Sequence, residues 1–151
     1  MMSLAHRLRA SRLYLCTDAR ERQGDLADFL RAAFAGGVDV VQIRQKDMER
    51  GAELEALEVA RSAAVATSGI VCVNDSPRVA KAFAADMLHL GQTDGSARRA
   101  RRSLHEWALV GRSTHTPEQA DAAVADPDVL ARVVDLVHTE GPTLRQEAAP
   151  R

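Results

Sequence analysis

Residues 38–47 read VDVVQIRQKD, an apolar run that ends in polar and basic residues where a turn would ordinarily follow. A short apolar run of this kind is typical of a buried strand. Alternation along the strand puts Gln42 and Arg44 on the same side as Val40. Ile43 faces the opposite side. The segment therefore predicts a strand whose last residues present polar side chains on one face.

Apolar runs of the same kind recur along the chain and alternate with helical periodicity. The runs predict strands at 12–17, 38–44, 70–73, 87–90 and 108–113. Helices are predicted at 25–35, 51–66 and 96–106, and after the Ser-Pro and Thr-Pro pairs at 76–77 and 116–117. Five such units favour parallel strands joined by helical crossovers in an α/β fold. On these grounds a doubly wound sheet and a (β/α)₈ barrel fit equally well.

The composition is that of one globular domain. The chain has 151 residues, of which 46% are hydrophobic and 27% charged, enough for a single core. A net charge of −1 provides no global field that would recruit nucleic acid or a membrane. The apolar runs are shorter than the ~20 residues of a membrane-spanning helix, and the N-terminus lacks the apolar segment of a secretory signal. We therefore expect a cytoplasmic protein.

Two further features have structural interpretations. The basic run ARRARR at 97–102 has no interleaved aromatic residues, so it predicts a solvated helix face and no nucleic-acid partner. Cys16 and Cys72 each lie inside an apolar run with no second cysteine nearby. This pattern predicts two buried free thiols.

Carboxylates and an amide follow two neighbouring strands. Ligands of parallel α/β sheets bind at the carboxyl ends of the strands. Asn74 and Asp75 end the third predicted strand, and Asp94 follows the fourth. Two carboxylates from adjacent strand ends can share one Mg²⁺, which takes one or two carboxylates together with water and substrate phosphates. These residues are therefore candidates for a magnesium site.

Arg44, Lys46 and Ser113 add groups that suit phosphate. The arginine offers a planar fork of donors, the lysine a point charge and the serine a hydroxyl. Each residue also has an ordinary interpretation as a solvated strand end or as turn chemistry. Taken together with the two aspartates, they indicate a Mg²⁺-dependent diphosphate site.

The chain contains, in this order, the segments LYLCTD, VQIRQKD, VNDSPRVA, ADMLHLGQTD and VGRSTHTPEQA. Their sequence and spacing resemble five motifs of the thiamine phosphate synthase family, over about residues 12–125. That family is a (β/α)₈ TIM barrel. It joins a hydroxymethylpyrimidine diphosphate to a thiazole phosphate and releases pyrophosphate. The resemblance therefore implies a barrel of which this chain supplies about five to six βα units.

The resemblance also implies a role for each matching residue. Gln42 would face the pyrimidine, and Arg44 and Lys46 the diphosphate. Asp75 and Asp94 would hold Mg²⁺. The implied substrate-binding residues are Gln42, Ile43, Arg44, Gln45, Lys46, Asn74 and Ser113. In the family, the pyrimidine methylene becomes a carbocation-like centre that the thiazole nitrogen captures, so no catalytic nucleophile is expected.

The resemblance ends near residue 128. The family continues with a Gly-Pro segment, a TxTK motif and Gly-rich phosphate loops, none of which is recognisable here. A chain of 151 residues is also short for eight units, which take about 200 at least. We expect a partial barrel over 1–128 and a divergent tail over 129–151, either frame-shifted or disordered.

Three functions remain open from the sequence. The first is a Mg²⁺-dependent synthase acting on two small-molecule substrates, with a homo-oligomer as one possible assembly. The second is a catalytically impaired remnant that binds the diphosphate without turnover. The third is a protein like the related thiazole tautomerase. Retention of Lys46, Asp75 and Asp94 favours the synthase.

Arg112 departs from the family pattern, because many members carry a smaller or apolar residue before the serine. By alternation it shares a side of the sheet with Val110. An unpaired buried charge is costly. We therefore expect its guanidinium to reach outward from the strand end.

Overall fold

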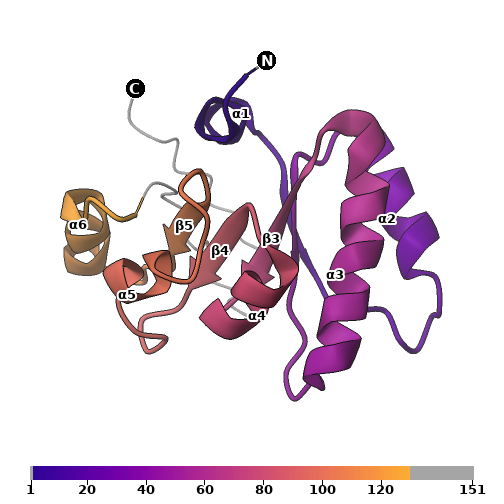
Figure 1. The fold of residues 1–151 in the computed structure, drawn as a ribbon. Helices are drawn as coiled ribbons and strands as arrows, with labels where there is room; N and C mark the ends of the chain where they lie inside the picture. The colour runs from indigo at the N-terminus through magenta and orange to yellow at the C-terminus, as the bar shows by residue number, and fades with distance from the viewer. Residues whose placement is uncertain (1, 130–151) are drawn as a thin grey trace.

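Five parallel strands and the helices between them make up the fold of the computed structural model, which describes residues 2–129 (Figure 1). Residues 130–151 of the predicted tail lie outside the described part of the chain. The strands are Tyr14–Thr17 (β1), Val40–Ile43 (β2), Ile70–Asn74 (β3), Met87–Leu90 (β4) and Leu109–Arg112 (β5). The helices are Leu4–Ala10 (α1), Leu26–Ala35 (α2), Arg50–Ala64 (α3), Pro77–Phe83 (α4), Ala97–Arg101 (α5) and Pro117–Ala125 (α6), with a 3₁₀ turn Val65–Thr67 (η1) after α3.

The order of the strands decides between the two folds left open by the sequence. Each strand pairs in parallel with the next one along the chain, in the order β1-β2-β3-β4-β5. A doubly wound sheet would reverse direction at a switch point, whereas successive pairing is the arrangement of a (β/α)₈ barrel. Helices α2 to α6 follow one another around the sheet (Figure 1). The predicted partial barrel of five βα units is confirmed.

The side of the sheet that faces α2 to α6 carries the larger core. Val41, Ile43, Val73, Leu88 and Val110 point from the strands into this cluster and are at most 2% exposed. The helices contribute Leu30, Phe34, Leu57, Ala60, Ala80 and Phe83. Because strand residues alternate, every second position of each strand faces this helix-side core.

The opposite side of the sheet, which is the inner side of the barrel, has a smaller apolar cluster. It consists of Val40, Ile70, Cys72, Met87 and Leu109. Helix α1 covers it with Leu4, Ala5 and Leu8, and Tyr14 packs beside them. Ser3 caps α1 by accepting a hydrogen bond from the His6 amide at 3.2 Å. No helix is predicted over residues 4–10, so the position of α1 on the inner side is a finding of the structure.

Two predictions about local structure were wrong. Cys72 is fully buried as expected, but Cys16 is exposed. The reason is that β1 is an outer strand of the described sheet, and the inner apolar cluster under α1 does not extend to Cys16. The basic helix predicted at 96–106 ends at Arg101. Arginines three and four residues apart repel one another on a helix surface, which disfavours a longer helix here. Across residues 2–129, none of the helices has the length and apolarity needed to cross a bilayer.

Candidate active site

The inner side of the strands changes from apolar to polar toward their carboxyl ends. Gln42 follows Val40 on this side of β2, and Asn74 follows Cys72 on β3. His89 follows Met87 on β4. Ser113 comes directly after β5, on the same side as Leu109. Parallel pairing places all these ends at one edge of the sheet, which is where barrel proteins bind ligands.

Hydrogen bonds join these inner polar side chains across the strands. The Gln42 side chain is 3% exposed, accepts from the Tyr14 hydroxyl at 2.5 Å, and donates through Nε2 to Asn74 Oδ1 at 2.6 Å. His89 Nε2 lies 2.7 Å from Ser113 Oγ, and both side chains are buried. The Tyr14 and His89 rings meet edge to face at 6.5 Å. These contacts hold a polar layer in place at the carboxyl ends of the strands.

Asp75 and Asp94 lie close together at this edge. Desolvation raises the pKa of the Asp75 carboxyl, and the neighbouring Asp94 carboxylate raises it further. The Asn74 side chain and the Arg44 guanidinium oppose that rise. Two carboxylates that disfavour each other's charge are a donor set that a hard divalent cation would stabilise. The residues present therefore fit Mg²⁺, with water and phosphate oxygens completing its ligands.

The carboxylates come from two loops of unusual backbone. Asp75 directly follows β3 with a φ of +59°, and its amide donates to the His89 carbonyl at 2.8 Å. A left-handed conformation is uncommon outside glycine, and aspartate is among the residues that tolerate it. Asp94 Oδ2 accepts a hydrogen bond from the Gly91 amide at 2.7 Å. Within residues 2–129 no cluster of three or more His, Cys, Asp or Glu could hold a metal by protein ligands alone.

The VQIRQKD segment distributes its side chains over different environments. Arg44 and Lys46 are exposed at the edge that carries the aspartates, and Arg44 lies near enough to lower the pKa of Asp75. Ile43 is 2% exposed in the helix-side core, so the structure does not bring its side chain into the polar layer. The segment thus offers two cations, and its apolar residue anchors the strand.

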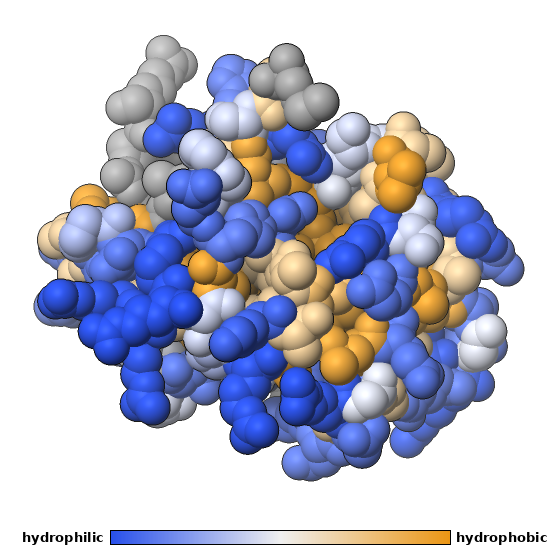
Figure 2. Space-filling view, in the orientation of Figure 1, coloured by the Kyte–Doolittle hydropathy of each residue, from blue (hydrophilic) through white to orange (hydrophobic). Residues whose placement is uncertain are grey.

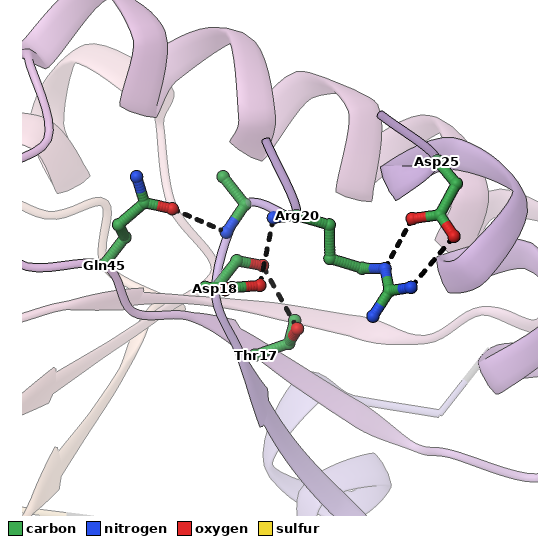
Figure 3. A network of polar contacts seen from close by, with 6 residues as sticks. Thr17, Asp18, Arg20, Asp25 and Gln45 are labelled. Atoms are coloured by element: carbon green, nitrogen blue, oxygen red, sulfur yellow. Dashed lines mark hydrogen bonds and ion pairs between the residues drawn. The ribbon is translucent and has the colours of Figure 1, made fainter. Parts of the chain in front are cut away.

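Gln45 connects two loops at the same edge (Figure 3). Its Oε1 accepts a hydrogen bond from the Ala19 amide at 3.0 Å, which ties the loop after β2 to the loop after β1. In the loop after β1, the Arg20 guanidinium donates two hydrogen bonds of 2.5 and 2.9 Å to the Asp25 carboxylate. The Arg20 amide donates to the Asp18 carboxylate. The geometry gives Gln45 a role in loop packing. Its contact with a substrate remains a prediction.

A cavity of about 320 Å³ lies between α4 and α5, beside Asp94. Arg78 and Arg99 line it together with Ser96 and Ser103. In the space-filling view, strongly hydrophilic residues cover the surface over α5 (Figure 2). The predicted solvated face of this basic helix therefore adjoins the carboxylate edge.

Tyr14 and His89 contact the inner polar layer, and neither is among the site residues predicted from the sequence. His89 pairs with Asn74, a member of this layer, and Tyr14 pairs with Val40, two residues before Gln42 on the same side of β2. Alternation from the apolar residue Met87 places His89 on the inner side, and it was available from the sequence alone. Alternation predicts the side of the sheet on which His89 lies, but it does not predict that His89 forms a hydrogen bond with Ser113.

Known proteins match most of this chain. The thiamine monophosphate synthase family matches residues 13–133. The thiamine-phosphate synthase of Streptomyces avermitilis is 51% identical over 123 residues, which are 82% of this chain and 57% of that protein. That of Thermobifida fusca is also 51% identical, over 80% of this chain and 56% of the relative. The chain thus spans little more than half the length of these curated relatives.

A solved structure shows the same arrangement of elements. The thiamine phosphate pyrophosphorylase from Pyrococcus furiosus matches with a TM-score of 0.68 and 26% sequence identity, over 81% of this chain and 57% of the other. The family match covers more than half of the chain, and both the fold and the inner polar layer lie within it. The chain belongs to the thiamine monophosphate synthase family.

Proposed function

We propose that this chain takes part in the thiamine-phosphate synthase reaction and provides its Mg²⁺-dependent pyrimidine diphosphate site. In that reaction a hydroxymethylpyrimidine diphosphate is joined to a thiazole phosphate, and pyrophosphate is released. The observation that carries the proposal is the pair of neighbouring carboxyls, Asp75 and Asp94, with Arg44 beside them at the carboxyl edge of the sheet. A site of this composition suits a metal-bound diphosphate.

The polar layer explains how the pyrimidine diphosphate would be oriented. Gln42 is held on both sides by Tyr14 and Asn74, so its amide has a defined orientation toward a pyrimidine ring. Arg44 and Lys46, exposed at the same edge, would contact the diphosphate oxygens. Ser113, fixed by His89, would hydrogen-bond the substrate from β5. The pyrimidine would thus face the inner polar layer and the diphosphate would face the two loops.

The breaking and forming of bonds in this reaction would develop negative charge close to these residues. The carbon–oxygen bond between the pyrimidine methylene and the diphosphate breaks, and its electron pair leaves with pyrophosphate. The thiazole nitrogen supplies the electron pair of the new carbon–nitrogen bond. Arg44 and Lys46 stabilise the negative charge that develops on the leaving group. Held by Asp75 and Asp94, Mg²⁺ would supply Lewis-acid stabilisation of the same oxygens.

Calorimetric titration with pyrophosphate, with MgCl₂ or with EDTA, tests the site. We expect Mg²⁺-dependent binding by the chain. Asp75→Asn and Asp94→Asn should each weaken it by about 10-fold or more, since loss of residues that only support metal ligands already costs 10–100-fold. Asp121→Asn on the exposed surface of α6 is the matched control and should bind normally. Unchanged Mg²⁺ dependence in both site variants would contradict the assignment.

Product formation from both substrates tests the reaction itself. Thiamine phosphate formed by the purified 151-residue chain would support the synthase. Mg²⁺-dependent binding without product would instead support the alternative of a remnant that binds the diphosphate without turnover. Conversion of a thiazole isomer without coupling would favour the tautomerase. A cytoplasmic location and a homo-oligomer remain predictions from the sequence.

A further inference from the structure

Arg112 ends β5 one residue before Ser113 and does not extend freely into solvent. Its Nη1 donates to the Gly91 carbonyl and its Nη2 to the Gly95 carbonyl, both at 2.7 Å. The side chain is half-buried. The expectation that it reaches outward from the strand end is met only in part, because the guanidinium stops at the loop that follows β4. It thereby contacts the first and last residues of the five-residue loop 91–95.

Loop 91–95 is folded closely around the Asp94 carboxylate. The Gly91 amide donates to Asp94 Oδ2 at 2.7 Å, and the Asp94 amide donates to the Gly91 carbonyl at 3.3 Å. A Cβ at position 91 would lie 2.7 Å from Asp94 Oδ2, so a larger residue would displace the carboxylate. Gly95 has a φ of +90°, which L side chains rarely adopt. The direction of the Asp94 carboxylate therefore depends on the shape of this loop.

Arginine suits the contact for a chemical reason. Its planar fork presents several donors in fixed directions, and here two of them reach carbonyls at opposite ends of the loop. Lysine has a compact ammonium that cannot reproduce that spacing. A second tether runs from Gln92 Nε2 to the Ser113 carbonyl at 2.5 Å. Side chains and backbone of β5 thus hold the loop that carries one of the two carboxylates.

We propose that Arg112 is a positioning residue for the candidate metal site. By fixing both ends of loop 91–95, it keeps the Asp94 carboxylate directed toward Asp75 and so sets the affinity for Mg²⁺ and diphosphate. This inference rests on the proposed function of the Asp75–Asp94 pair. Arg112 acts only through the loop and has no assigned contact with a substrate.

Arg112→Met, Arg112→Lys and the control Arg98→Met test the inference in the full chain. Arg98 is exposed on α5, and no hydrogen bond or ion pair is found for it among the described residues. We expect Arg112→Met to weaken Mg²⁺-dependent pyrophosphate binding about 10-fold or more, the range found for residues that support metal ligands. Arg112→Lys should fall between Arg112→Met and the parent. Arg98→Met should bind as the parent does.

Amide hydrogen exchange provides a readout that does not require a ligand. Exchange at Gly91 and Asp94 should become about 10-fold faster in Arg112→Met, while the amides of β3 keep their protection. If Arg112→Met does not fold, the lysine variant decides by the same two measurements. The positioning role is overturned if exchange at Gly91 and Asp94 is the same in the variant and the parent. It is also overturned if exchange becomes faster while Mg²⁺-dependent pyrophosphate binding stays unchanged. Failure of the parent chain to bind would overturn the proposed function, and exchange would still decide whether Arg112 orders the loop.

Discussion

At the scale of single residues, position in the sheet separates groups that look alike in the sequence. Cys16 and Cys72 lie on the inner side of β1 and β3. Cys72 is 0% exposed beneath α1, and desolvation raises the pKa of its thiol to about 12. Cys16 is exposed on an outer strand of the described sheet. The thiolate is the reactive form of cysteine, so the two cysteines should differ strongly in their rate of alkylation.

Alkylation with iodoacetamide at about pH 8 should modify the folded chain once, at Cys16. A pKa raised above the ordinary value leaves Cys72 protonated at this pH, and burial also blocks the reagent. Mass spectrometry should find one adduct under native conditions and two in denaturant. The folded Cys16→Ser variant should gain none. Rapid modification of Cys72 in the folded protein would show that the inner cluster is open.

At the scale of elements, the junction between η1 and β3 limits how closely α2 can pack. Gly69 follows Ser68, whose φ is +56°. The Gly69 amide donates a hydrogen bond to the Ala64 carbonyl at 3.0 Å. A Cβ at Gly69 would lie 2.3 Å from Cε1 of Phe34 in α2. The Phe34 ring is 2% exposed and is enclosed by the helix-side core. Glycine at this position therefore permits the contact between the junction and α2.

Gly69→Ala should lower the free energy of unfolding by about 1–3 kcal/mol, the usual cost of forcing extra atoms into a packed core. Urea denaturation monitored by circular dichroism measures the change. The matched control is Gly51→Ala at the start of α3, where the nearby atoms belong to the flexible carboxylate of Glu49. It should be neutral or slightly stabilising, because alanine favours a helix over glycine. Equal stability of Gly69→Ala and the parent would contradict the packing argument.

At the scale of the whole molecule, α1 joins the N-terminal segment to the inner side of the sheet. Leu4 and Leu8 pack on the inner apolar cluster. The Arg7 guanidinium donates to the carbonyls of Ser68 and Gly69, just before β3. Figure 1 shows α1 apart from the succession of helices α2 to α6. The helix thus covers the beginning of the strands and leaves their carboxyl ends accessible for the candidate site.

Leu8→Ala should lower the free energy of unfolding by about 1–2 kcal/mol, below the range for fully buried leucines because Leu8 is half-buried. The variant should also bind more of a hydrophobic dye, since part of the inner cluster becomes accessible. Arg9→Ala, an exposed position on the same helix, is the control and should change neither quantity. Parent-like stability in Leu8→Ala would mean that α1 does not hold the inner side closed.

The sequence by itself determined the strands and the side of the sheet on which their residues lie, and it named candidate residues for the site. The strand predicted at 87–90 is β4 without change, and the one predicted at 38–44 is longer than β2 by two residues at the start and one at the end. Apolar periodicity and capping residues act within a few positions, so they can be read locally. For the same reason alternation correctly separated Gln42 from Ile43.

Only the tertiary structure decided which of these residues meet. The proximity of Asp75 and Asp94, the hydrogen bond between His89 and Ser113, and the contacts of Arg112 all join different βα units. Such contacts depend on strand order and register, and a local pattern contains neither. Alternation says which way a side chain points. The parallel pairing of five successive strands decides which other side chains it contacts. That pairing brings separate loops together as one candidate site.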